Sequence, residues 1–214
     1  SSDLTYTQLH DAVTKSQLPF YLSTGASTLA EITRAVEIIR EKNTHIDIRL
    51  IHTVLEVPTP ASHINLSAIP FLKERMGLPI AYGQHSNVPQ AISAAIAAGA
   101  ESVFVYVAEE LSPDLPDGPH AVLCSGVGDI LKMLAEVNSM MGPRERVLGE
   151  NERSMRSKVR RSIIAARAIP QGKIINPEDI CFKRPEDGIP AWDINCVLGH
   201  KAPQKYAPDE TISV

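Results

Sequence analysis

The most reactive group of side chains in this 214-residue sequence lies around His85. His85 follows the short apolar segment Pro79 to Tyr82 and stands between Gln84 and Ser86. An imidazole can ligate a divalent metal or transfer protons near neutral pH. A loop histidine can equally serve to hold its neighbours by hydrogen bonds. The residue types around His85 leave these roles open.

A divalent metal that is bound by an imidazole normally needs further protein ligands. Three residues of a later loop carry suitable donor atoms, namely Glu109, Glu110 and His120. Nothing in their spacing selects among them. His52 lies within an apolar segment and is interpreted as an interior histidine rather than a ligand.

A second candidate site is the turn that begins with Ser23 and Thr24. Gly25, Ala26 and Ser27 follow, directly ahead of a predicted helix. Hydroxyls and backbone N–H groups at a helix amino terminus suit a phosphate or a carboxylate. A capped turn without a ligand uses the same residue types. The pattern is therefore compatible with anion binding without requiring it.

Four strand-turn-helix units are predicted to position these residues. The apolar strand segments are residues 19–23, 46–53, 79–82 and 102–106, and helical patterns follow at Leu29 to Ile39, Leu66 to Met76, Ala91 to Ala98 and Asp129 to Met141. Thr28 and Glu31 are spaced as a capping box at the start of the first helix. Strands separated by helices indicate parallel pairing and the α/β class. Four such strands fit either a small doubly wound sheet or half of an eight-stranded barrel.

The pattern changes after residue 142. Residues 143–160 are rich in arginine and poor in apolar side chains, and we interpret them as a linker and docking segment. Residues 161–214 hold short β-like segments separated by many prolines and glycines, which predicts a compact β-rich module. Trp192, the only tryptophan, is expected to pack in the core of that module. The predicted organisation is thus an α/β domain at 1–142, a linker at 143–160 and a β module at 161–214.

Composition argues against several classes of protein. The sequence is 43% hydrophobic with a net charge of −4, so it lacks the basic excess of a nucleic-acid-binding protein. It has no apolar run of the roughly 18 residues that a membrane span requires. Its three cysteines lack metal-binding spacing and cannot all pair, which suggests a reducing, cytoplasmic environment.

The order of several short motifs resembles the sialic acid synthase family. In the first domain these motifs are Ser1 to Thr5, Leu22 to Thr28, Pro58 to Pro60, Asn65 to Ile69, Gly77 to Tyr82 and His85. The terminal module is similar to that family's antifreeze-like (SAF) domain, a β-clip, through Arg161 to Ala166, Pro170 to Ile174, Lys183 to Pro185 and Val197 to Ala202. The resemblance covers essentially the whole chain.

The resemblance implies that the first domain is about half of a (β/α)₈ TIM-type barrel that begins near the end of the fourth barrel strand. It also implies condensation of phosphoenolpyruvate with an N-acylated hexosamine such as N-acetylmannosamine, assisted by a divalent metal, Mn or Mg. In that reaction carbon 3 of phosphoenolpyruvate attacks the open-chain aldehyde while water adds at carbon 2. Members of the family form domain-swapped homodimers, so this chain is expected to do the same.

By the same resemblance His85 is a catalytic residue and a metal ligand, Ser23 and Thr24 bind phosphoenolpyruvate, and Arg184 binds the sugar. The family's second metal-binding histidine has no counterpart in the segment Tyr106 to Glu109. Glu109 could replace it only if the loop shifts by one position.

Gly83 stands where relatives have a serine that contacts phosphoenolpyruvate. Together with the missing histidine, this departure supports an alternative function. The chain would then be a catalytically impaired relative that acts as a sugar-binding or partner subunit. The sequence is compatible with both functions.

Overall fold

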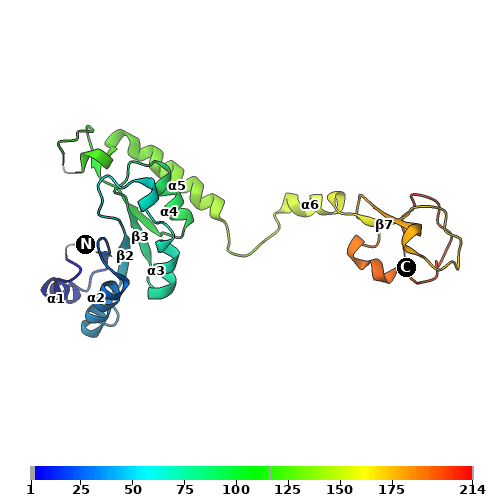
Figure 1. Cartoon of the computed structure of the whole chain (residues 1–214), viewed down its shortest axis with the longest axis horizontal. Helices are drawn as coiled ribbons and strands as arrows, with labels where there is room; N and C mark the ends of the chain where they lie inside the picture. Colours follow the sequence, from blue (N-terminus) through cyan, green and yellow to red (C-terminus); the bar gives the residue numbers. More distant parts are fainter. Residues whose placement is uncertain (1–2, 116, 214) are drawn as a thin grey trace. The chain divides into compact units, whose positions relative to one another are not determined.

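The chain forms two compact units, Ser1–Gly142 and Pro143–Val214, which are described separately (Figure 1). The structure is a computed structural model, and it describes residues 3–115 and 117–213. Ser1 and Ser2, which begin the first motif of the family resemblance, lie outside the described residues.

The first unit is built on a parallel sheet whose strands follow one another in the order of the sequence. The strands are β1 (Phe20–Ser23), β2 (Ile48–His52), β3 (Ile80–Gly83) and β4 (Ser102–Phe104). The helices that follow them are α2 (Leu29–Lys42), α3 (Ala68–Met76), α4 (Gln90–Ala97) and α5 (Val127–Met141). A doubly wound sheet reverses its strand order at a switch point, whereas a barrel does not. The consecutive order, without a switch point among the four strands, is the one expected for part of a (β/α)₈ barrel.

The two faces of the sheet differ in burial. On one face Leu22, Leu50 and Ile80 lie next to one another on neighbouring strands and pack in the core that the helices cover. On the opposite face Tyr21 and Phe104 are partly exposed, and their rings meet edge to face with centroids 4.8 Å apart. These two residues belong to the outermost strands, so their contact shows that this face is strongly concave.

Local signals explain where several elements begin. Thr28 and Glu31 form the predicted capping box, in which the Thr28 hydroxyl accepts from the Glu31 N–H and the Glu31 carboxylate accepts from the Thr28 N–H.

Two elements differ from those predicted from the sequence. Helix α1 (Thr7–Ser16) was not predicted. Strand β4 ends at Phe104, so the prediction of a strand through Tyr106 was too long. Beyond it, β5 (Val107–Ala108) pairs in parallel with β6 (Val122–Leu123).

The second unit contains helix α6 (Glu150–Val159) and the antiparallel strands β7 (Ser162–Ala165) and β8 (Ile180–Lys183). Helix α6 lies within the segment that was interpreted as a linker. Asp179 is buried and accepts charged hydrogen bonds from Lys173 (2.6 Å) and Arg167 (2.7 Å). The Lys173 ammonium and the backbone N–H of residue 176 hold the pKa of the Asp179 carboxyl well below its usual range.

Trp192 does not pack in the core of the second unit, so that prediction was wrong. Its side chain is 69% exposed, on the short helical segment Ala191–Cys196, where the Arg160 guanidinium lies 5.2 Å from the ring centroid. Tyr206 is the large aromatic residue of the core and is 2% exposed. None of the helices formed by the described residues combines the length and the apolar character needed to cross a bilayer.

Gly83 generates a prediction about how strand β3 fits against β2. A Cβ at this position would stand 3.0 Å from side-chain atoms of Ile51 and Thr53, closer than normal packing. We expect Gly83→Ala to lower the free energy of unfolding of the first unit by about 1–2 kcal/mol in urea denaturation. The matched control is Gly128→Ala on helix α5, where a Cβ meets nothing within 4 Å. This control should raise stability by up to about 1 kcal/mol, and an equal gain for both variants would contradict the account.

Candidate functional site

Polar residues follow each of the four parallel strands at the same edge of the sheet. Thr24 follows β1, Thr53 follows β2, His85 follows β3 and Tyr106 follows β4. Carboxyl ends of parallel strands form one edge, and this is where barrel enzymes place their active sites. Among these residues the structure brings His85, Thr53 and Tyr106 into direct contact.

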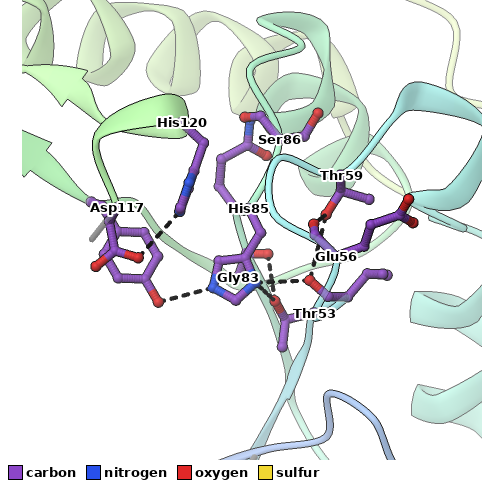
Figure 2. A network of polar contacts seen from close by, with 11 residues as sticks. Thr53, Glu56, Thr59, Gly83, His85, Ser86, Asp117 and His120 are labelled. Atoms are coloured by element: carbon purple, nitrogen blue, oxygen red, sulfur yellow. Dashed lines mark hydrogen bonds and ion pairs between the residues drawn. The ribbon is translucent and has the colours of Figure 1, made fainter. Parts of the chain in front are cut away.

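Both nitrogens of the buried His85 ring have hydrogen-bond partners (Figure 2). Nδ1 lies 2.8 Å from the Val54 carbonyl oxygen and 3.2 Å from Thr53 Oγ1. A carbonyl only accepts, so Nδ1 must carry the proton. The Thr53 hydroxyl donates to the Gly83 carbonyl at 3.0 Å and is free to accept from Nδ1. His85 is thus held as the Nδ1–H tautomer, with Nε2 as its acceptor.

The Tyr106 hydroxyl lies 2.9 Å from His85 Nε2 and donates to it, and the two rings stack with centroids 5.4 Å apart. Burial and the nearby Asp117 carboxylate both raise the pKa of the Tyr106 phenol. The phenol therefore keeps its proton near neutral pH. The sequence reading treated Tyr106 as part of a strand, and only its place just beyond a strand end could have marked it as a site residue.

His120 completes this group from the short helical segment Gly118–His120. Its ring meets His85 and Tyr106 edge to face, with centroids 5.2 and 4.9 Å away. The ring is buried, and neither nitrogen has a hydrogen-bond partner among the described residues. Nε2 lies 3.6 Å from Asp117 Oδ1. Burial lowers the pKa of His120, the proximity of His85 adds to this, and Asp117 opposes it.

The residues around His85 do not fit the divalent metal that the family resemblance implied. Nδ1 is directed at a backbone carbonyl, and Nε2 is occupied by the Tyr106 hydroxyl. In the part of the chain that the structure describes, no three histidine, cysteine, aspartate or glutamate residues are grouped to hold a metal ion. Glu109 is exposed. The described residues therefore provide no set of donor atoms for the metal that was predicted at His85, and the reaction proposed below does not use one.

The turn after β1 is largely saturated by its own hydrogen bonds. Thr24 Oγ1 donates to the Ile51 carbonyl at 2.9 Å, and Ser27 Oγ donates to the Gly25 carbonyl at 3.1 Å. The Glu31 carboxylate of the capping box adds negative charge at the helix amino terminus, which disfavours a second anion.

Thr24 lines a cleft of about 900 Å³ that Thr53 also lines. Thr53 and Val54 both line this cleft and both contact His85, so they connect the cleft to the His85 ring. Ser23 lies in strand β1, opposite Ile51 of β2. Because side chains alternate along a strand, Ser23 and Thr24 face opposite sides of the sheet. His52 is an interior histidine, as expected, and its Nε2 lies 3.0 Å from the Ile64 carbonyl oxygen.

Arg184 lies directly after β8 in the second unit, and its side chain is exposed. Among the described residues the structure gives it no hydrogen bond or ion pair. The two units are described separately, so a sugar-binding role for Arg184 stays a prediction.

Comparisons with known proteins agree with this fold. The model of the NeuB family matches residues 1–146, and that of the SAF domain matches residues 160–213. An uncharacterized protein of Methanocaldococcus jannaschii is 31% identical over 99% of this chain and 63% of its own length. The N,N'-diacetyllegionaminic acid synthase of Campylobacter jejuni is 26% identical over 99% of this chain and 64% of its own length.

A solved structure, a putative spore coat polysaccharide biosynthesis protein E from Chromobacterium violaceum, superposes with a TM-score of 0.78 at 22% identity, covering 100% of this chain and 64% of that one. This likeness shows the shared fold. The chain spans less than two thirds of the length of each of these proteins. By the match of the family model to its first 146 residues, the chain belongs to the NeuB family and continues into a SAF domain.

Proposed function

We propose that the protein containing this chain is a nonulosonic acid synthase, which condenses phosphoenolpyruvate with an N-acylated hexosamine such as N-acetylmannosamine. Relatives that are named as synthases of such acids support this reaction class. The observation that carries the proposal is the position of His85. It lies at the carboxyl edge of the sheet, hydrogen-bonded on both ring nitrogens and in contact with a protonated phenol.

In this proposal Tyr106 is the proton donor and His85 orients it. Attack by carbon 3 of phosphoenolpyruvate turns the aldehyde oxygen into an alkoxide, which takes the proton of the Tyr106 hydroxyl when this O–H turns away from His85 Nε2. The water that adds at carbon 2 loses a proton, and this proton restores the phenol. The C–O bond between carbon 2 and the phosphate then breaks, so that phosphate leaves with the proton of the new hydroxyl and carbon 2 becomes a ketone. A positioned donor of this kind contributes typically 10²–10⁴-fold to a rate. Of the two predicted residues, Ser23 shares a strand face with Tyr21 and is proposed to lie near the phosphoenolpyruvate, whereas Thr24 faces the other side of the sheet and is not retained in this role.

A second function is favoured by the same contact. Because the Tyr106 hydroxyl occupies Nε2 of His85, the position at which a metal would bind is filled. Without a metal as Lewis acid, this protein would bind an N-acylhexosamine and turn it over slowly or not at all. It would then serve as a sugar-binding or partner subunit.

Assembly and location extend the proposal. The SAF unit of one subunit is proposed to place Arg184 at the sugar of a second copy, in a domain-swapped homodimer. Cys124, Cys181 and Cys196 are all free thiols, which supports a reducing, cytoplasmic location.

Tyr106→Phe separates the two functions, because it removes one oxygen while keeping the ring stack. If Tyr106 donates the proton, release of phosphate from phosphoenolpyruvate in the presence of N-acetylmannosamine should fall about 100-fold or more, and added manganese should not restore it. His85→Ala should cause a loss of similar size. An increase in activity with manganese in Tyr106→Phe would show instead that the hydroxyl only blocks a metal site. Absence of turnover in the unmodified protein, with retained sugar binding, would favour the second function.

Arg184→Ala tests the assembly. Loss of a charged contact to the sugar should raise the dissociation constant for N-acetylmannosamine about tenfold or more in calorimetry, while phosphoenolpyruvate binding stays within twofold. Arg153→Ala, on the exposed surface of α6, is the matched control and should change neither constant. Equal weakening of both ligands by Arg184→Ala would contradict the assigned role.

A further inference from the structure

A second cleft lies behind the His85 loop, between the segment that follows β3 and helix α5. Its volume is about 540 Å³, within the range of small-molecule pockets. Its walls are mostly aliphatic, and Val88, Ile92, Leu111, Ile130 and Met133 supply much of the apolar surface. The one charged residue among its lining residues is Asp129, whose side chain is 86% exposed and directed to solvent. The cleft is therefore suited to an uncharged, largely apolar molecule.

Gln84 lines this cleft, and only the nitrogen of its side-chain amide is hydrogen-bonded among the described residues. The residue is 4% exposed, and its Nε2 donates to the backbone carbonyls of Ser86 and Val88. Its Oε1 is buried and has no hydrogen-bond partner among the described residues. A buried acceptor without a partner destabilises the protein relative to one that is hydrogen-bonded. A ligand that donates to Oε1 would recover this free energy.

His120 lines the same cleft, and neither of its ring nitrogens has a hydrogen-bond partner in the part of the chain that the structure describes. It stands between the cleft and the His85 site, since its ring edge contacts His85 and Tyr106. Figure 2 shows the His85 ring directed toward Thr53, whereas Ser86 lies on the far side of the His85 backbone from that ring. The two sites are thus back to back across one loop.

We propose that this cleft binds a neutral, largely apolar molecule that carries a single N–H or O–H donor, and that the donor pairs with Gln84 Oε1. Three observations carry the proposal: the mostly apolar walls, the absence of an inward charge among the described lining residues, and two buried polar lining residues with unpaired side-chain atoms. The site is separate from the proposed condensation and does not depend on it.

Indole and 1-methylindole test the proposal on the unmodified protein, because they share a bicyclic apolar body and differ in the N–H. We expect calorimetry to show indole binding about tenfold more tightly than 1-methylindole, the difference that one hydrogen bond to a buried acceptor makes. Gln84→Met keeps the length of the side chain and removes the acceptor. It should lower the affinity for indole to that for 1-methylindole. Equal affinities of the two probes for the unmodified protein would overturn the role of Gln84.

The location is tested from helix α5. Ile130→Phe narrows the cleft and should weaken both probes at least tenfold. The matched control is Leu131→Phe, at a neighbouring position whose side chain is 62% exposed, and it should leave both affinities unchanged. Absence of binding at millimolar indole, or binding that Ile130→Phe does not weaken, would overturn the site itself. Because the probe comparison uses the unmodified protein, a variant that fails to fold does not prevent a decision.

Discussion

The chemistry of the candidate site depends on the two hydrogen bonds that fix the His85 ring. The Val54 carbonyl requires the proton on Nδ1, and this leaves Nε2 as an acceptor for the Tyr106 hydroxyl. An imidazole with both nitrogens engaged in hydrogen bonds is a poor starting point for metal binding. In the proposed reaction it orients the phenol that donates the proton. The departure from the family pattern is thus a coherent local structure.

The fold produces this arrangement through strand order. Consecutive parallel strands place the residues that follow β2, β3 and β4 next to one another, so Thr53, His85 and Tyr106 meet although more than 50 positions separate the first from the last. Gly83 belongs to the same arrangement. Its missing side chain leaves room for Thr53, whose hydroxyl links the Gly83 carbonyl to His85. Thr53 thus occupies the space beside strand β3 that a side chain at position 83 would need.

The sequence predicted the local elements better than their lateral contacts. Hydrophobic periodicity and the Thr28 capping box were sufficient to predict the strand and helix units, because those signals are local. The lateral order of the strands, which decides between a barrel and a doubly wound sheet, is set by packing and came from the family resemblance. The exposure of Trp192 was missed because composition alone does not show which side of a short helical segment faces the core.

Only part of the candidate site was predicted, because local sequence marks single residues but not the contacts between distant positions. His85 could be singled out by its place after a strand, and His120 by its donor atoms. Tyr106 could not, since its role arises from a contact across 21 positions that no spacing rule describes. The same contact makes the predicted metal ligand a hydrogen-bonded imidazole.

The most direct test is the protonation state of the His85 ring, measured by ¹⁵N nuclear magnetic resonance of the imidazole nitrogens at neutral pH with and without manganese. We predict a protonated Nδ1, an unprotonated Nε2 that accepts a hydrogen bond, and no paramagnetic broadening of the His85 signals by manganese at concentrations up to the millimolar range. An Nε2–H tautomer, or selective broadening of the His85 signals by micromolar manganese, would contradict the account.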